Sequence, residues 1–180
     1  HLVKTYSKSA GAKNVRLNGD LGLKGALDSS WKLKIAKSPG DTVFLTLDDL
    51  KSLPKTEITF DFKCIEGWSQ ISHWGGVKFS DLARRYNLLS QSEMSYAGLI
   101  TPDKQYYVGI DMASMMHPQT LLCYEMNGKP LPLKHGYPLR LIIPVKYGIK
   151  SLKRIGTLFF SNTPPPDYWY ERGYDYYSGL

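Results

Sequence analysis

The chain of 180 residues has only two cysteines, Cys64 and Cys123, and no long hydrophobic run. Two cysteines exclude a disulfide framework but leave one Cys64–Cys123 bridge open. No stretch approaches the about 18 apolar residues of a membrane-spanning helix, so we expect no membrane span. Internal repeats and recognised nucleic-acid-binding motifs are also missing, so we expect no nucleic-acid partner.

The composition is that of a folded protein, with 42% hydrophobic and 13% aromatic residues. A chain of this length is expected to form one domain with a sizeable core. The net charge of +7 suits an anionic partner, such as a phosphate-bearing cofactor or an oxyanion. Because the lysines are scattered outside 146–154, diffuse solvated charge is an equally simple explanation.

Apolar and polar residues alternate in several segments, which is typical of half-buried strands. We expect strands over 31–36, 43–45, 58–64, 96–100, 106–110, 138–143 and 152–160. Helices are expected over 47–53 and 81–88, with Thr46 and Ser80 as N-caps. Pro118 and Gly128 favour a helix over 119–126, with a strand over 121–124 as the alternative. Strands outnumber helices in mixed order, which predicts an α+β domain with a mixed, largely antiparallel sheet.

Three parts of the chain differ in composition. Residues 1–13 are polar and predict an N-terminal arm, and residues 14–160 contain all the predicted strands and helices. Within this domain, the Gly- and Asn-rich segment 14–25 predicts a loop whose amides could approach a phosphate or a ring. Residues 161–180 carry six aromatic residues after three prolines, and we expect an ordered C-terminal wrap because so many rings would not remain in water.

Cys64 closes the apolar face of the strand over 58–64, just before the turn at Glu66 and Gly67. A thiol in this place is a core residue, half of a disulfide, a nucleophile or a metal ligand. Composition alone favours the core residue. As a nucleophile, Cys64 would need a base, for which His73 and His135 are the candidates.

Cationic side chains recur later in the chain. His135 and Arg140 lie five residues apart across Pro138, and Arg140 falls in the apolar segment PLRLIIP. A long cation in a buried strand requires an anionic partner, either a bound phosphate or an internal carboxylate. The loop over 146–153 combines a glycine, a serine and three lysines, which could hold a phosphate or form an exposed basic loop.

Six segments carry a specific resemblance: 64–69 (CIEGWS), 74–77 (WGGV), 117–121 (HPQTL), 127–131 (NGKPL), 135–141 (HGYPLRL) and 146–153 (KYGIKSLK). In this order they resemble the molybdopterin-binding domain of the sulfite oxidase superfamily, over roughly 15–160. The succession is most similar to the bacterial branch that includes the catalytic subunit of the periplasmic methionine sulfoxide reductase. The resemblance therefore implies a single-domain sulfite-oxidase-like fold.

The resemblance also implies a cofactor, Mo-molybdopterin, with the Cys64 thiolate as the molybdenum ligand. A soft anionic sulfur suits such a metal centre. His135 stands where the reductase branch has Asn. Asn18 matches the asparagine of the N-terminal cofactor loop only loosely. The implied cofactor-binding residues are Asn18, Thr101, His135, Arg140, Ser151, Leu152 and Lys153, of which Leu152 is implied through its backbone.

The implied function is an oxidoreductase that transfers oxygen atoms or electrons, with a small oxo-substrate such as a sulfoxide. Sulfite oxidases follow the cysteine with an Asn-Arg type segment, whereas Ile65 and Glu66 stand here, and Glu66 would repel sulfite. The alternatives are sulfite-type oxidation and a non-catalytic pterin- or phosphate-binding module of the same fold.

The resemblance further implies a separate redox partner, either a cytochrome or a haem-containing membrane subunit. It also implies a periplasmic location after export in the folded state. The chain begins with His1 rather than Met, so we expect that upstream residues were removed, either a leader peptide or other added residues. Without the dimerisation domain of animal and plant sulfite oxidases, we expect a monomer. The aromatic tail, which differs from the reductase branch, could shape the substrate funnel, dock a partner or only pack.

Overall fold

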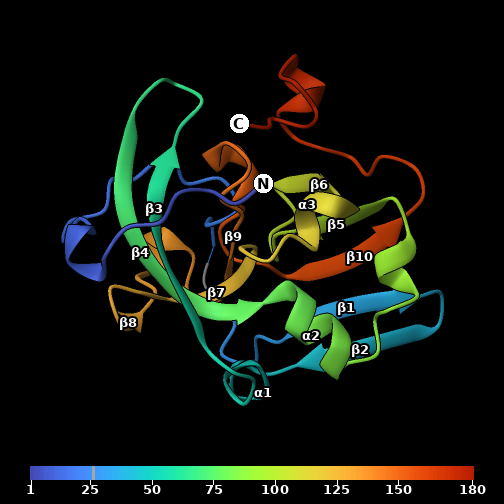
Figure 1. Ribbon diagram of the computed structural model, residues 1–180. Coiled ribbons are helices and arrows are strands. Elements are labelled where there is room, and N and C mark those ends of the chain that lie inside the picture. Colours follow the sequence, from blue (N-terminus) through green and yellow to red (C-terminus); the bar gives the residue numbers. More distant parts are fainter. Residues whose placement is uncertain (26) are drawn as a thin grey trace.

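A computed structural model describes residues 1–25 and 27–180, and it contains two five-stranded sheets (Figure 1). The first sheet has the order β2-β1-β10-β5-β6, and β1 and β10 form its parallel pair. Its strands are β1 (Leu33–Ser38), β2 (Asp41–Leu45), β5 (Tyr96–Ile100), β6 (Tyr107–Asp111) and β10 (Thr157–Ser161). The other pairs in this sheet are antiparallel.

The second sheet has the order β3-β4-β7-β8, and β9 also pairs with β7. Its strands are β3 (Thr56–Lys63), β4 (Ser69–Lys78), β7 (Leu121–Met126), β8 (Lys129–Pro130) and β9 (Arg140–Ile142), and all their pairs are antiparallel. Three short helices connect the strands, namely α1 (Leu47–Lys51), α2 (Phe79–Arg85) and α3 (Met112–Met115). The predicted α+β domain with a mixed, largely antiparallel sheet is confirmed.

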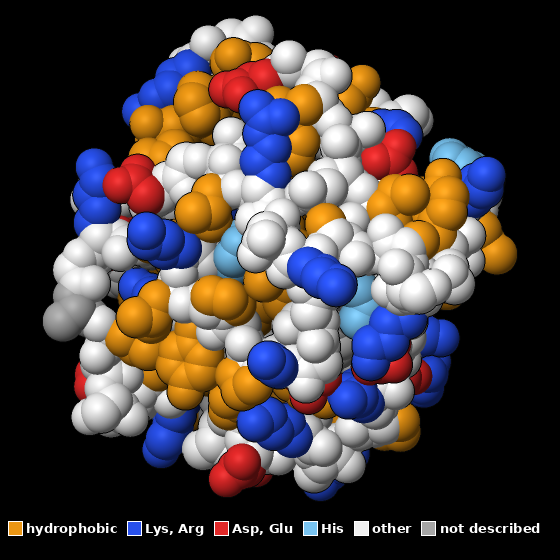
Figure 2. Space-filling view, turned by 90° about the vertical axis from the view of Figure 1, so that its left-hand side faces the viewer, with side chains coloured by type: hydrophobic (Ala, Val, Ile, Leu, Met, Phe, Trp, Pro, Cys, Tyr) orange, Lys and Arg blue, Asp and Glu red, His pale blue; other side chains and the backbone are white. Residues whose placement is uncertain are grey.

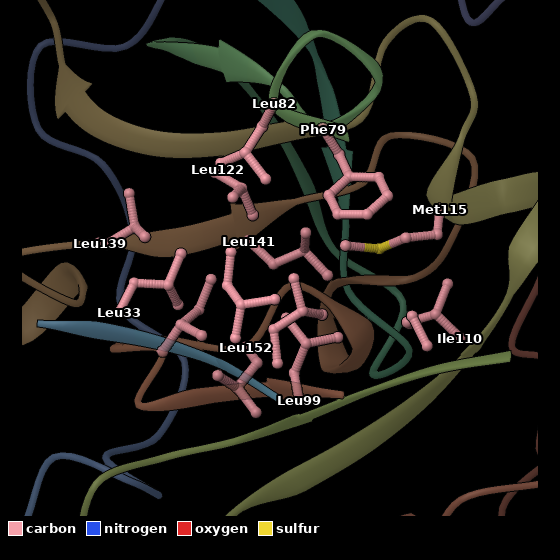
Figure 3. Close-up of a cluster of buried hydrophobic side chains, with 14 of the residues drawn as sticks. Leu33, Phe79, Leu82, Leu99, Ile110, Met115, Leu122, Leu139, Leu141 and Leu152 are labelled. Atoms are coloured by element: carbon pink, nitrogen blue, oxygen red, sulfur yellow. The ribbon is translucent and has the colours of Figure 1, made fainter. Parts of the chain in front are cut away.

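The main hydrophobic core lies where the two sheets and the helices meet (Figure 3). Leu33 and Leu99 from the first sheet pack with Leu122 and Leu141 from the second, and all four are fully buried. Phe79 of α2 packs into the same cluster. A smaller cluster lies on the opposite side of the second sheet and includes Phe60, Trp74 and Ile142.

The predicted helix over 119–126 is wrong, because Leu121–Met126 forms strand β7. Residues Leu121 to Tyr124 are all buried, and they contribute to the main core and to the smaller cluster in turn. A strand buried on both faces reads as a continuous apolar run, which periodicity cannot distinguish from a helix. Asn127 and Gly128, both with positive φ, make the hairpin turn to β8 rather than end a helix.

Strand β4, Ser69–Lys78, was not predicted, although it is the longest in the described chain. Its alternation is interrupted at Gly75 and Gly76, where the pairing with β7 contains an irregularity. A Cβ on Gly76 would lie 2.1 Å from the carbonyl oxygen of Leu122, so this glycine allows the close strand approach. The hairpin of β3 and β4 positions the predicted cysteine turn.

Most element boundaries differ from the prediction by a few residues. The predicted capping at Thr46 is confirmed, since Thr46 and Asp49 form a capping box at α1. Helix α2 begins at Phe79, so Ser80 lies inside the helix rather than capping it. The predicted strand over 152–160 begins only at Thr157, because the preceding residues form an irregular segment.

The N-terminal arm packs along the second sheet. Tyr6 donates to the Thr59 carbonyl and Ala12 donates to the Ile71 carbonyl, so the arm runs along β3 and β4. Figure 2 shows the side of the molecule that carries these strands, with Lys and Arg side chains scattered over it and acidic side chains interspersed among them. Within residues 1–25 and 27–180, no helix combines the length and apolar character required to cross a membrane.

The contribution of the main core can be tested at Phe79, which is fully buried in it. We expect Phe79→Ala to lower the free energy of unfolding by about 3–5 kcal/mol, through lost burial and a residual cavity. Urea denaturation provides the measurement. The control is Leu133→Ala, whose side chain is 60% exposed and which should change stability by less than about 0.5 kcal/mol. Equal losses in both variants would contradict this assignment of the core.

Candidate cofactor-binding site

A cleft of about 420 Å³ lies where six segments of the described chain converge. These are the 15–21 loop, the β3–β4 hairpin, the residue just before β6, the 135–140 segment leading into β9, the 148–153 loop and the C-terminal tail. Representative lining residues, one from each segment in that order, are Asn18, Trp68, Tyr106, Arg140, Ile149 and Trp169. The cleft thus brings together side chains from Val15 near one end of the sequence to Tyr174 near the other.

Cys64 lies immediately after β3 and beside this cleft, with 2% of its surface exposed. Its backbone N–H donates to the Trp68 carbonyl, which closes the hairpin turn. Its Sγ atom accepts hydrogen bonds from Asn18 Nδ2 at 3.1 Å and from the Glu66 backbone N–H at 3.4 Å. Donors aimed at the sulfur stabilise negative charge there, as a metal-ligating thiolate requires.

The disulfide alternative is excluded, because Cys64 and Cys123 are both free thiols. Cys123 is buried in the smaller hydrophobic cluster, and burial raises the pKa of its thiol to about 12. Its Sγ donates to the Glu125 carbonyl. Cys123 is therefore an inert core cysteine, whereas Cys64 adjoins the cleft.

The histidine-activated nucleophile is also not formed. His73 is hydrogen-bonded through Nδ1 to Thr59 Oγ1 at 2.6 Å and does not line the cleft. His135 does line it, but no hydrogen bond joins His135 to Cys64 in the described part of the chain. Burial, with Arg140 and Lys153 nearby, lowers the pKa of His135 to about 4, so this imidazole is neutral at pH 7.

Arg140 is the most unusual charge in the site. Strand alternation in β9 directs Leu141 into the main core and turns Arg140 to the side of the smaller cluster. Arg140 is 3% exposed, and its guanidinium lies 4.8 Å from the centroid of the Trp74 ring. It donates to the carbonyl oxygens of His135 and Ser151, at 3.2 and 2.9 Å.

These carbonyl contacts leave the charge of Arg140 uncompensated. Among the described residues no carboxylate lies within ion-pair distance, and Nε has no hydrogen-bond partner. Burial lowers the pKa of Arg140 to about 10. Of the two partners considered from sequence, the internal carboxylate is therefore not found among the described residues, and the geometry suits an anion entering the cleft.

The three lysines of the 146–153 loop have different roles. Lys146 pairs with Asp111 at 2.7 Å, and Lys150 pairs with the buried carboxylate of Asp167. Lys153 lines the cleft and donates to the carbonyl oxygens of Asn18 and Gly19. Burial and the nearby Arg140 lower the pKa of Lys153 to about 8. Of the three lysines, Lys153 is therefore the one that lines the cleft, and the alternative of an exposed basic loop is wrong because Lys146 and Lys150 are buried.

Of the other residues implied by the resemblance, one lines the cleft and two do not. Ser151 lines the cleft, and its hydroxyl accepts a hydrogen bond from the Ile143 N–H. Leu152 is buried in the main core. Thr101 does not line the cleft, because its hydroxyl donates to Asp103 and its methyl group lies against Gly22. The structure therefore brings Asn18, His135, Arg140, Ser151 and Lys153 to one cleft with Cys64 beside them, and leaves Thr101 and Leu152 behind its wall.

Sequence reasoning left open whether the aromatic tail shapes the substrate funnel, and it did not predict which individual rings line the cleft. Trp68, Trp74 and Tyr106 contribute from the body of the domain, and Trp169 and Tyr174 contribute from the tail. The guanidinium of Arg16 lies 4.4 Å from the centroid of the Trp68 ring, at one side of the cleft. The concentration of aromatics in the tail was the available signal, but nothing in the sequence showed which rings would face a ligand.

These features fit a molybdopterin cofactor. A thiol with two N–H donors suits a metal, a buried unpaired guanidinium suits a phosphate, and aromatic walls suit a planar ring system.

Several known proteins are similar to this chain. A protein of Azospira oryzae, named as the YedZ1 subunit of a protein-methionine-sulfoxide reductase, is 36% identical over 84% of this chain and 56% of its own length. The protein-methionine-sulfoxide reductase catalytic subunit MsrP of Xanthomonas campestris pv. campestris is 33% identical over 79% of this chain and 48% of its own length.

A solved structure shares the fold. The sulfane dehydrogenase SoxCD of Paracoccus pantotrophus matches with a TM-score of 0.66 and 20% identity, over 78% of this chain and 41% of that one. The chain spans about half the length of the relatives named above. A family model described as the oxidoreductase molybdopterin binding domain matches residues 22–169. The chain thus belongs to the oxidoreductase molybdopterin-binding domain family, as the ordered motifs predicted.

Proposed function

We propose that this chain is the catalytic domain of a molybdenum-molybdopterin oxidoreductase that acts on a small oxo-substrate such as a sulfoxide. The observation that carries the proposal is a free cysteine beside a cleft that holds an uncompensated buried arginine. Membership of the molybdopterin-binding family and similarity to methionine-sulfoxide reductases support it.

In this proposal each residue has a defined task toward the cofactor. Cys64 ligates the metal, and Asn18 orients its sulfur through the 3.1 Å hydrogen bond. Arg140 and Lys153 neutralise the phosphate, while neutral His135 offers a polar contact without adding charge. When bound, the cofactor would supply the two-electron oxygen-atom chemistry, and the protein contributes ligation, orientation and access.

Thr101 and Leu152 have a supporting task in this proposal. Thr101 packs against Gly22 at the end of the N-terminal loop, and Leu152 anchors the 148–153 loop in the core. Both residues hold a cofactor loop in place from behind, rather than through a side-chain contact with the cleft.

Sulfoxide reduction has a simple balance. The S–O bond breaks, two electrons and two protons are consumed, and a thioether and water are released. The electrons would come from a separate redox partner, for which we propose a haem-containing membrane subunit. We further propose that the chain acts in the periplasm as a monomer.

Charge in the cleft favours a neutral substrate over sulfite. Once Arg140 and Lys153 are compensated by the cofactor phosphate, Arg16, Asp20 and Glu66 remain as charged lining residues. Glu66 follows Cys64 by two positions, and its backbone N–H contacts the sulfur. A cleft-lining residue with a carboxylate, two positions after the proposed metal ligand, disfavours a sulfite anion, which leaves sulfite-type oxidation as the weaker alternative.

The substrate assignment is tested by steady-state kinetics with the loaded protein. We expect reduction of methionine sulfoxide with a chemical electron donor, and little oxidation of sulfite. Glu66→Gln should raise kcat/KM for sulfite several-fold by removing like-charge repulsion, and should change sulfoxide reduction less. Faster turnover of sulfite than of sulfoxide by the unmodified protein would instead support a sulfite-type enzyme.

The metal assignment is tested by elemental analysis of protein purified from a host that makes molybdopterin. We expect near-stoichiometric molybdenum in the unmodified protein and its loss or weaker retention in Cys64→Ala, because the thiolate ligand is gone. Cys123→Ala is the matched control, since it removes a buried cysteine away from the cleft. Tightly bound pterin without metal or redox activity would favour the non-catalytic binding module.

The anion subsite is tested with sulfate, whose charge is constant between pH 7 and 9. The Lys153 pKa of about 8 means that this side chain is charged at pH 7 and largely neutral at pH 9. Sulfate binding to cofactor-free protein should therefore weaken roughly tenfold as the pH rises across this range. Calorimetric titration provides the binding constants. Lys153→Met should bind sulfate weakly at both pH values, whereas the exposed Lys129→Met should behave like the unmodified protein.

A further inference from the structure

We propose that the buried ion pair of Lys150 and Asp167 is a positioning joint that holds the aromatic wall of the C-terminal tail against the cofactor loop. In the absence of this pair, the tail residues that line the cleft would leave their places. The consequence for substrate binding rests on the proposed function, whereas the joint itself can be tested without it.

Asp167 organises the start of the tail. One carboxylate oxygen accepts from Lys150 Nζ and, at 3.1 Å, from the Gly109 backbone N–H of strand β6. The other oxygen accepts from the Tyr170 N–H at 3.0 Å, at the beginning of the 3₁₀ turn Tyr170–Arg172. A single buried side chain therefore connects the loop, the first sheet and the turn of the tail.

Lys150 is fully committed to this joint. Its side chain is 1% exposed, and Nζ also donates to the Gly109 carbonyl at 2.9 Å and lies 4.6 Å from the centroid of the Tyr176 ring. Its neighbours Ile149 and Ser151 line the cleft. Lys150 therefore lies between two cleft residues of the loop and is bound to the tail. It fixes the position of the tail relative to the loop.

A second contact docks the tail on the same strand. Tyr176 donates its hydroxyl to the Pro165 carbonyl and lies directly over Gly109. A Cβ on Gly109 would lie 1.8 Å from the Tyr176 hydroxyl, so this position must be glycine for the tail to dock. In Figure 1 the tail leaves the end of β10 at the right, passes above β6 and brings its C-terminus toward the β3–β4 side.

The joint determines where the tail rings stand. Trp169 and Tyr174 line the cleft, and their ring centroids are 5.3 Å apart in an edge-to-face arrangement. Both follow Asp167 by no more than seven residues, and the turn between them is the one that Asp167 caps. They complete a cleft whose other walls come from the domain, so the tail narrows access to the proposed metal site.

The same loop contains a matched pair for comparison. Lys146 is also buried and pairs with Asp111, which caps helix α3. Asp111 belongs to the end of β6 and does not line the cleft. Loss of this second pair would lower the stability of the protein without releasing the Tyr170–Arg172 turn. The comparison of the two pairs therefore distinguishes a positioning role from a general effect on folding.

The experiment combines limited trypsin digestion with kinetics on Asp167→Asn and the control Asp111→Asn. The reporter is Arg172, which is exposed but held to the Tyr168 carbonyl at 2.8 Å within the tail turn. We expect cleavage after Arg172, seen by intact mass as loss of residues 173–180, to become at least tenfold faster in Asp167→Asn and to stay unchanged in Asp111→Asn. In loaded protein, KM for the sulfoxide should rise about tenfold in Asp167→Asn, with molybdenum content and kcat nearly unchanged.

Asp167→Asn leaves the buried Lys150 without its carboxylate, which by itself could destabilise the protein. A second variant avoids this effect. Gly109→Ala retains both charged residues but displaces Tyr176, and it should release the tail in the same way. If trypsin cleaves after Arg172 no faster in Asp167→Asn and Gly109→Ala than in the unmodified protein, the joint does not exist. Cleavage in Asp111→Asn that is as fast as in Asp167→Asn would also overturn the joint. Released tails with an unchanged KM would overturn the positioning of a substrate wall. A molybdenum-free unmodified protein would instead contradict the proposed function, and the trypsin result would still decide whether the joint exists.

Discussion

The site depends on one buried guanidinium for which no described residue supplies a counter-ion. Arg140 is enclosed by Trp74 and Phe62, and in the described part of the chain its hydrogen bonds go to two carbonyl oxygens, so its charge suits an anionic ligand. Such a group is expensive to bury, and its cost is offset only when an anion arrives. Arg140 stays buried despite this cost in free energy because β9 is held between the main core and the smaller cluster. This packing prevents the Arg140 side chain from turning to solvent.

The other charged groups of the 146–153 loop show the opposite solution. Lys146 and Lys150 are buried with carboxylate partners, and these pairs attach the loop to β6 and to the tail. A loop that is anchored through two of its lysines can present the third, Lys153, to the cleft in a fixed position. The basic side chains of this loop therefore divide into two buried in ion pairs and one that lines the cleft, a difference that net charge alone does not reveal.

Part of the site could be read from the sequence, and the part that could not has physical reasons. The alternation that ends at Cys64 and the cation within an apolar strand at Arg140 are local signals, and both residues lie where those signals indicate. Thr101 is implied to contact the cofactor, yet its side chain packs against Gly22 instead of lining the cleft, because only the loop packing decides which side of a segment faces inward. Which rings of the tail line the cleft could not be read from the sequence for the same reason, since rings that pack and rings that line a cleft have the same composition.

The sequence by itself determined the family, the α+β class, the capping at Thr46 and the identity of the cysteine and arginine at the site, because these are properties of motifs and short-range periodicity. Tertiary structure decided that Leu121–Met126 is a strand, since burial on both faces removes the periodicity that would reveal it. It also decided that Lys150 meets Asp167 and that Gly109 lies beneath Tyr176. These contacts join residues 17 and 67 positions apart, and pairing over such separations is set by how the sheets, the loop and the tail fill the same space.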